Sequence, residues 1–237
     1  MADQVEGRNA VLESLRSGRA KKIYLSHSSK GKTIDEIEKL AKELNVPLLT
    51  QPNDVVVKMA KTDHHQGILA EVAELPKRNL EEIINLENPF IVILDHIQDP
   101  HNLGAILRTS EAAGVDAVIV PEDRSVSIGP GAIKASAGAI EYVPLITVTN
   151  IAQTIEKLKK ANIWVVGTAD KADQYYTELD LRGRLAIVIG SEGEGISRLV
   201  KEKCDFLVKI PMRGRISSLN ASVATGVILY EALRQRG

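Results

Sequence analysis

The sequence has one cysteine, Cys204, among 237 residues, so the chain cannot form an internal disulfide. This suits a reducing compartment, and we expect a cytoplasmic protein. No apolar run reaches the roughly 18–20 residues that a membrane-spanning helix needs. The first residues, MADQVEGRNAVLESL, are polar and acidic, unlike the basic start and apolar core of a signal peptide. We therefore expect no membrane association.

The chain also lacks a net charge of either sign. Thirty basic and 31 acidic residues leave −1 at pH 7, and the parts on either side of Leu75 are both close to neutral. No global field favours nucleic acid, so any RNA contact must come from local clusters. Two basic clusters exist: Arg16, Arg19, Lys21 and Lys22 at an expected helix end, and Arg213 with Arg215 near the C-terminus. Either cluster is also compatible with a solvated surface.

Several common catalytic signatures are absent. Neither the GxSxG elbow nor the GxxxxGK[ST] phosphate loop occurs. His96 and His101 flank a loop with Asp95 and Asp99, but this spacing matches no recognised metal site, so we expect no metal. Cys204 follows an expected helix, and we interpret it as a packed thiol rather than a nucleophile.

Hydrophobic and charged residues make up 44% and 26% of the chain, which is typical of a globular protein of one large or two modest domains. Residues 1–75 alternate helix and strand patterns and predict a small α/β domain. Thr33 is expected to cap the helix over 33–44, with Glu36 completing a capping box. Residues 76–89, which begin and end with proline and are mostly charged, are expected to form a linker with a short helix.

Residues 90–237 show a stronger pattern. Six apolar runs lack polar alternation, as strands of a parallel sheet covered on both faces do. The runs are 90–95, 117–122, 143–148, 163–169, 185–190 and 205–211. Helical patterns separate most of them, which predicts a doubly wound α/β domain whose ligands gather at the carboxyl ends of the strands.

The loop after the first of these runs carries the first candidate site. Asp99-Pro100 turns the chain, Asn102 lies near a helix start, and Gly104 permits a close backbone approach. Arg108 follows within the first turns of that helix, so Asn102 and Arg108 can point into one crevice. The alternative is that Asn102 is a helix cap and Arg108 a surface cation.

The loop at 190–195, GSEGEG, is the second candidate. A glycine-rich turn from strand into helix leaves backbone N–H groups free to hold a ligand. Its GxxGxG spacing differs from the GxGxxG dinucleotide fingerprint, which disfavours a nicotinamide-dependent oxidoreductase. The two glutamates would repel a pyrophosphate, but they tolerate a neutral or cationic ligand such as a sulfonium.

The third candidate is the loop MRGRISSLNAS, which follows the last apolar run. Ser217, Ser218 and Asn220 cluster at the start of the final helix, where a single such residue would often be only an N-cap. Three polar side chains and two arginines are more than a cap needs. Nearby apolar side chains can form a binding surface for an adenine: Ile210, Met212 and Leu219.

With these three loops, the sequence resembles the SpoU–TrmH group of knotted RNA 2′-O-ribose methyltransferases. The matching stretches are DPHNLGAILR at 99–108, KASAGAIEYVPL at 134–145, GSEGEG at 190–195, and IPM with SSLNASVATG within 210–226. Three separated motifs in the right order make the match specific, and Ala221, where valine is common, is a small departure. The front end, EGRNAVLE with HHQGILA, resembles the L30e-like RNA substrate-binding domain of the bacterial ribosomal RNA subgroup.

The resemblance implies a SPOUT catalytic domain over residues 90–237, with a deep trefoil knot, that works as a homodimer. S-adenosylmethionine would be the methyl donor, held by Gly190, Ile210, Met212 and Leu219. The catalytic set would be Asn102, Arg108, Glu192, Ser218 and Asn220. The substrate would be a guanosine ribose in 23S ribosomal RNA of the large subunit. The alternatives are a transfer RNA or antibiotic-resistance ribose methyltransferase, and an RNA-binding module that has lost catalysis.

The resemblance assigns the role of general base to Arg108, but the basicity of arginine conflicts with this role. A guanidinium, with a pKa above about 12, is not expected to lose its proton in a protein. The competing hypothesis is that Arg108 stays charged and stabilises the developing alkoxide and the phosphate, while water or Glu192 takes the proton.

Overall fold

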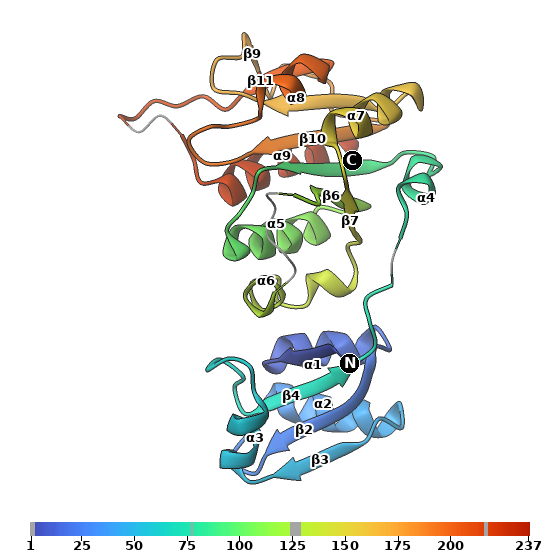
Figure 1. Cartoon of the computed structure of the whole chain (residues 1–237), viewed down its shortest axis with the longest axis vertical. Helices are drawn as coiled ribbons and strands as arrows, with labels where there is room; N and C mark the ends of the chain where they lie inside the picture. Colours follow the sequence, from blue (N-terminus) through green and yellow to red (C-terminus); the bar gives the residue numbers. More distant parts are fainter. Residues whose placement is uncertain (1–2, 77, 124–128, 216–217) are drawn as a thin grey trace.

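The structure is a computed structural model that describes residues 3–76, 78–123, 129–215 and 218–237. Figure 1 shows two units stacked along the long axis, with the N-terminal unit below and one extended segment leading to the larger unit above. In the described part of the chain, no helix is long and apolar enough to cross a membrane.

The N-terminal unit is a four-stranded sheet covered on both faces. Its elements are β1 Asp3–Glu6, α1 Arg8–Arg16, β2 Ala20–Ser26, α2 Lys32–Glu43, β3 Leu48–Gln51, α3 Asn53–Met59 and β4 Ile68–Val72. The strand order is β1-β4-β2-β3, with only β2 and β3 parallel. Apolar residues of α1 and α2 pack on one face, and Val56 of α3 packs against Tyr24 and Leu69 on the other.

The predicted α/β pattern of this unit is confirmed, but the predicted cap of α2 is wrong. The helix begins at Lys32 with Gly31 as N-cap and no side-chain cap. Because Thr33 lies inside the first turn, its hydroxyl cannot take the N-cap position. Glu36 instead accepts a hydrogen bond from Arg16 at 2.5 Å. The short strand β1 was not predicted.

The segment between the two sheets contains α4, Leu80–Ile84, which Asn79 caps by accepting a hydrogen bond from the Glu82 N–H. Ile83 and Ile84 are buried in the core of the larger unit. The side chain of Arg184 donates hydrogen bonds to the carbonyls of residues 84, 86 and 87, and so fastens the end of this segment to the start of a central strand.

The larger unit is an all-parallel seven-stranded sheet. Its strands are β5 Phe90–Asp95, β6 Ala117–Pro121, β7 Leu145–Val148, β8 Trp164–Thr168, β9 Gln174–Tyr175, β10 Leu185–Gly190 and β11 Phe206–Lys209. They lie in the order β7-β6-β5-β10-β8-β11-β9. All six predicted strands are present, and β9 is an additional edge strand. Strand order does not define a knot, so the implied trefoil knot stays a prediction.

Helices cover both faces of this sheet, as predicted for a doubly wound domain. They are α5 Pro100–Ala112, α6 Pro130–Ala135, the 3₁₀ turn η1 Ala139–Glu141, α7 Ile151–Lys160, α8 Arg198–Lys203 and α9 Ala221–Arg236. One face packs against α5 and α9, and the other packs against α4, α7 and α8. Gly104 of α5 was predicted to permit a close approach, and a Cβ there would lie 2.3 Å from that of Ala135 on α6.

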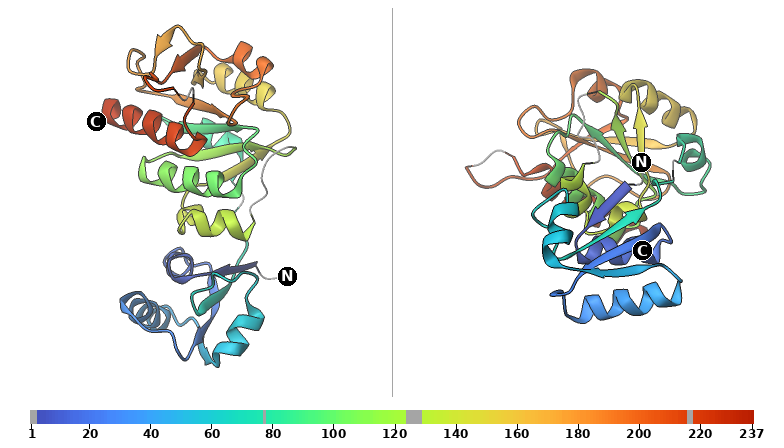
Figure 2. Two further views of the ribbon diagram at one scale, coloured as in Figure 1. Left: turned by 90° about the vertical axis from the view of Figure 1, so that its left-hand side faces the viewer. Right: turned by 60° about the horizontal axis from the view of Figure 1, so that its bottom comes forward.

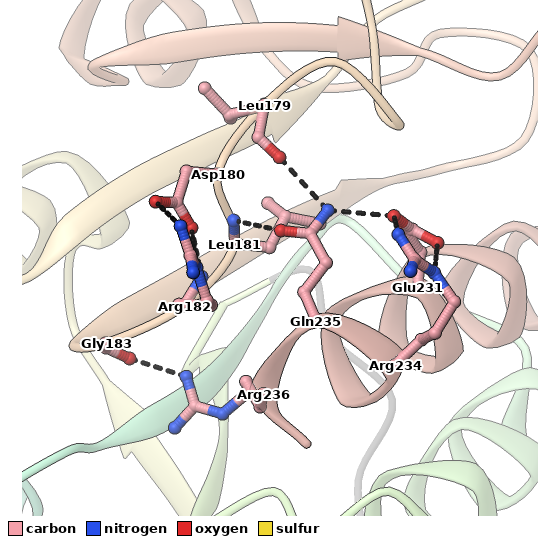
Figure 3. Close-up of polar contacts among 9 residues, drawn as sticks. All are labelled: Leu179, Asp180, Leu181, Arg182, Gly183, Glu231, Arg234, Gln235 and Arg236. Carbon is pink, nitrogen blue, oxygen red and sulfur yellow. Dashed lines mark hydrogen bonds and ion pairs between the residues drawn. The ribbon is translucent and has the colours of Figure 1, made fainter.

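The end of α9 is tied to the segment that precedes β10 (Figure 3). The Gln235 side chain accepts a hydrogen bond from the Leu181 N–H at 2.8 Å and donates one to the Leu179 carbonyl at 3.1 Å. Arg236 donates to the Gly183 carbonyl. These contacts fix the last helix against the start of the strand whose other end carries the glycine-rich loop.

The two units meet at a polar contact that includes Arg19 of the first basic cluster. Arg19 donates hydrogen bonds to both carboxylate oxygens of Glu141, at 2.6 and 2.9 Å, and to the Ala73 carbonyl. The Tyr142 hydroxyl donates to Glu13 of α1. Arg16 and Arg19 therefore pair with carboxylates of the protein itself.

Candidate active site

Three loops meet at the carboxyl edge of the sheet. They follow β5, β10 and β11, which are parallel, and Asp95 at the end of β5 lies beside Gly190 at the end of β10. Figure 1 shows the segment after β11 extending from this edge, on the left of the view. The predicted meeting of these loops is therefore present.

The centre of the site is a hydrogen-bonded cluster that takes one residue from each loop. The Asn102 side-chain amide donates to Glu192 Oε1 at 2.9 Å. The Asn220 amide donates to Asn102 Oδ1 at 2.9 Å and also to Glu192 Oε1. The Ala221 N–H adds a longer bond to the same carboxylate oxygen, at 3.3 Å. The cluster therefore joins the starts of α5 and α9 to the glycine-rich loop.

The two asparagines differ in how they relate to the helix starts. Asn220 caps α9, because its Oδ1 accepts from the Ser222 N–H at 3.0 Å and from the Ser222 hydroxyl at 2.6 Å. Its amide hydrogens stay available for the cluster, so the cap and the site use opposite ends of one side chain. Asn102 is not a cap, since Asp99 caps α5 through the His101 N–H.

The glycine-rich loop turns sharply after β10. A Cβ at Gly190 would lie 2.0 Å from the carbonyl carbon of Gly195, so only glycine fits there. Gly193 and Gly195 have positive φ angles of 90° and 67°, a conformation that favours glycine. The Gly195 N–H donates to the Ser191 carbonyl at 2.9 Å and closes the turn.

Asp95 supports this loop from below, and the sequence analysis did not assign it a role in the site. Its side chain is 2% exposed; Oδ2 accepts from the Ser197 N–H at 2.7 Å, and Oδ1 lies 2.6 Å from His96 Nδ1. The sequence does hold a sign of this role, since Asp95 is a carboxylate at the end of an apolar strand. A buried acid of this kind needs hydrogen-bond partners.

The apolar residues predicted to hold the cofactor surround the same edge. Ile210 is half-buried against the core and Leu219 is half-buried, while Met212 is exposed. Ser218 is exposed with no hydrogen bond to another described residue, and Ser217 lies outside the described residues. Partly exposed apolar side chains beside a tight glycine turn and a carboxylate fit an adenosyl sulfonium better than a phosphate.

Arg108 is not part of the hydrogen-bonded cluster. It is exposed on α5 and makes no hydrogen bond or ion pair with any residue of the described ranges. An α-helix places it about 9 Å along the axis from Asn102 and about 120° round it. Arg213 and Arg215 are likewise exposed, in the segment after β11. These cations remain free to meet an anionic substrate.

Two weaker candidates are the loop with His96 and His101, and Cys204. The described residues hold no group of three histidine, cysteine or acidic side chains arranged for a metal. Cys204 ends α8, and burial raises the pKa of its thiol to about 12. The thiol also donates to the Val200 carbonyl at 3.2 Å and packs against the core, which supports the interpretation of a packed cysteine.

Comparisons with known proteins agree with this geometry. The family model described as the SpoU rRNA Methylase family matches residues 89–230, and the model described as RNA 2′-O ribose methyltransferase substrate binding matches residues 4–78. The chain is 46% identical to the 23S rRNA (guanosine-2′-O-)-methyltransferase RlmB of Pseudomonas putida, over 99% of this chain and 97% of the relative. It is also 42% identical to a Bacillus subtilis relative with the provisional name TrmH family tRNA/rRNA methyltransferase YacO. That match covers 99% of this chain and 96% of the relative.

Solved structures share the whole fold. The SpoU methyltransferase AviRb from Streptomyces viridochromogenes, in complex with AdoMet, superposes with a TM-score of 0.82 and 25% identity, over 98% of this chain and 89% of that one. A structure described as an RNA 2′-O ribose methyltransferase superposes with a TM-score of 0.83 and 29% identity. The match covers 98% of this chain and 88% of that one. Fold, loop cluster and matches together define an RNA 2′-O-ribose methyltransferase. Within that class the chain belongs to the SpoU rRNA methylase family, which confirms the resemblance predicted from its motifs.

Proposed function

We propose that this protein transfers a methyl group from S-adenosylmethionine to the ribose 2′-hydroxyl of a guanosine in 23S ribosomal RNA. Relatives named RlmB, which match almost the full chain, support the substrate, and the AdoMet complex of AviRb supports the cofactor. The observation that carries the proposal is the Asn102–Glu192–Asn220 cluster, because it holds all three motif loops in one polar centre.

The cofactor-binding residues follow from their places on the carboxyl edge. The crowded turn at Gly190 presents backbone groups rather than side chains, and the half-buried Ile210 and Leu219 supply apolar contacts for an adenine, with Met212 beside them. When bound, S-adenosylmethionine supplies an activated methyl group on a sulfonium leaving group. The chain itself has to align the acceptor oxygen and manage its proton.

Glu192 acts as the common acceptor that sets the orientation of both asparagine amides. With those amides fixed, the Asn102 and Asn220 side chains present a rigid polar surface to the ribose, so that little ordering remains to be done when RNA binds. Ser218, exposed next to them, faces the RNA on the same loop. These residues position the 2′-oxygen, and neither asparagine nor Ser218 needs to change its charge.

Arg108 is the cation of the site. Its guanidinium has no carboxylate partner in the described residues, so it is available for a phosphate and for the alkoxide that develops on the 2′-oxygen. Water or Glu192 then accepts the hydroxyl proton. This assignment keeps Arg108 protonated throughout, as its intrinsic basicity requires.

The remaining assignments follow the two-unit architecture. Residues 1–75 form the RNA substrate-binding domain and residues 90–237 the catalytic domain, joined by residues 76–89.

We also propose a homodimer, because α9 exposes apolar side chains along one stripe: Val223, Tyr230 and Leu233. A second copy of the chain would cover such a stripe. A substrate in ribosomal RNA supports the expectation of a cytoplasmic protein.

The proposal is tested by incubating the protein with methyl-labelled S-adenosylmethionine and purified 23S, 16S or transfer RNA. We expect label in 23S RNA alone, at a linkage that resists alkaline hydrolysis because its 2′-oxygen is blocked. Label in transfer RNA instead would transfer the assignment to the tRNA-modifying branch of the family. Absence of label from all three RNAs would contradict the proposed activity.

A further inference from the structure

A polar pocket of about 480 Å³ lies in the N-terminal unit, far along the chain from the catalytic loops. It is lined by Arg8, Ser28, Ser29, Asn53, Gln66 and Gly67. These residues come from the start of α1, the loop after β2, the start of α3 and the turn before β4. No acidic residue lines the pocket. The first turns of α2 and α3 carry Asp35 and Asp54, but neither side chain belongs to its wall.

The pocket joins two sequence segments that stand far apart. Gln66 Oε1 accepts a hydrogen bond from the Arg8 N–H at 3.0 Å, which brings the GRNAV and HHQG segments together. Gly67 is required at this join, because its φ is +75° and a Cβ there would lie 2.0 Å from Ser29 Oγ. The pocket is therefore a built feature of the unit, with its walls fixed by specific contacts.

The guanidinium of Arg8 has no partner in this pocket. Its Nε is buried without a hydrogen bond, and neither terminal nitrogen pairs with any residue that the structure describes. The neighbouring Glu6, which is a possible partner, instead accepts hydrogen bonds from Lys61, Thr62 and Gln4. A half-buried cation without a carboxylate is unfavourable until an anion joins it.

The surroundings of Arg8 make that demand stronger. A Cβ on Gly31, the N-cap of α2, would lie 3.4 Å from Arg8 Nη1, so the guanidinium lies against the positive end of a helix that has no side-chain cap. The helix α1 likewise begins without a side-chain cap or an acidic residue in its first turn. The guanidinium and the positive N-terminal ends of the helices repel one another. An anion bound between them would offset this repulsion.

The elements that carry the pocket residues reach the same side of the molecule as the segment after β11. In Figure 1 the carboxyl ends of β2 and β3 and the start of α3 lie on the left, the side from which the segment after β11 extends. The left view of Figure 2, turned by 90°, brings this side of both units toward the viewer. A strand of RNA whose ribose is at the Asn102 cluster can therefore run past the N-terminal unit on this side.

We infer that the Arg8 pocket binds a backbone phosphate of the RNA substrate, with Arg8 as the cation and Ser28, Asn53 and Gln66 as polar partners. The inference rests on the proposed function and adds to it the place where the N-terminal unit holds the RNA. Because the contact is to a phosphate, it contributes affinity and register without reading the base sequence.

The test compares the binding of 23S ribosomal RNA by full-length variants over a series of salt concentrations. Arg8→Gln removes the cation, and Asn53→Asp puts a negative charge on the exposed rim at nearly constant volume. Lys42→Gln is the matched control, since it removes one exposed positive charge from the last turn of α2, at the other end of the helix. Calorimetry with S-adenosylmethionine checks the distant catalytic site.

We expect Arg8→Gln to raise the Kd for RNA about tenfold and to lower the slope of log K against log salt by about 1. Asn53→Asp should also raise the Kd severalfold, whereas Lys42→Gln should change it less than twofold. Cofactor affinity should stay unchanged in all three. If Arg8→Gln does not fold, the comparison of Asn53→Asp with Lys42→Gln decides the question.

Two results separate this inference from the proposed function. If Arg8→Gln and Asn53→Asp bind RNA as Lys42→Gln does while the wild type methylates 23S RNA, the phosphate pocket is refuted and the activity stands. If the variants lose RNA affinity but the wild type methylates no RNA, the pocket stands and the proposed activity is refuted.

Discussion

Asn220 and Asn102, 118 residues apart in the chain, are joined by a hydrogen bond of 2.9 Å between their side-chain amides. Each lies at the start of a helix, α9 and α5, and Glu192 accepts from both. This relationship makes the last motif of the sequence dependent on the first. It joins three loops that are far apart in the sequence into one hydrogen-bonded cluster.

The turn at Gly190 is expected to be intolerant of any side chain. Gly190→Ala places a Cβ 2.0 Å from the backbone of Gly195, so the loop must move away from the Asn102 cluster. We expect the Kd for S-adenosylmethionine to rise at least tenfold by calorimetry. Gly183→Ala, at the other end of the same strand, meets only the strain of a positive φ of 74°. It should lower stability by about 1 kcal/mol and leave the Kd unchanged. Equal Kd values for the two variants would contradict the assignment.

Arg108 is expected to act while it carries its proton. Arg108→Lys keeps the positive charge, so it should retain a measurable rate, and Arg108→Gln should lose about a hundredfold or more. If Arg108 were the general base, the wild-type rate would rise with pH across the whole range from pH 6 to 10, and the lysine variant would approach its plateau at lower pH, because an amine titrates at lower pH than a guanidinium. Rates from pH 6 to 10, measured at saturating cofactor, distinguish the two roles.

The contact between the two units is expected to contribute strongly to stability. The side chains of Arg19 and Glu141 are 10% and 1% exposed, so Arg19→Ala leaves a buried carboxylate without its partner. We expect a loss of about 3–5 kcal/mol in the free energy of unfolding, measured by urea denaturation. Arg182→Ala breaks an exposed pair with Asp180 and should cost less than about 1 kcal/mol. A similar small loss for Arg19→Ala would show that the contact is incidental.

Cys204 gives a pH-dependent prediction. Burial raises the pKa of its thiol to about 12, whereas an unfolded cysteine has a pKa near 9.0. Between these pH values the unfolded chain loses a proton that the folded chain keeps, so stability falls as pH rises above about 9. Cys204→Ala should remove this part of the alkaline destabilisation. Reaction with a disulfide reagent at pH 8 should be slow in the native protein and fast in denaturant; fast native labelling would contradict the burial.

Much of the fold was predictable because buried parallel strands have a distinctive pattern. Runs such as 90–95 and 185–190 lack polar alternation, and each became a strand with the predicted bounds. The two-residue strand β9 was not predictable, because it pairs at a sheet edge that is created only by β11. The predicted cap of α2 was wrong for a local reason. Gly31 and Thr33 are both near the helix start, and the helix begins after Gly31.

The site was predictable in its residues but not in its connections. The sequence analysis placed Asn102, Glu192 and Asn220 in the site, and the hydrogen bonds between them depend on long-range packing that no local pattern contains. Asp95 was missed for the same reason, because its partner Ser197 reaches it only when β5 and β10 pair. The roles of these residues in catalysis stay predictions.

The most direct test of the Asn102–Asn220 relationship is the single-turnover rate of Asn220→Ser on 23S RNA, followed as 2′-O-methylguanosine by nucleoside mass spectrometry. Serine can still cap α9, so stability should change by less than about 1 kcal/mol, but it cannot donate to Asn102 and Glu192. We predict a rate about a hundredfold lower, with a cofactor Kd within threefold of the wild type. A rate equal to that of the wild type would show that the cluster does not position the ribose.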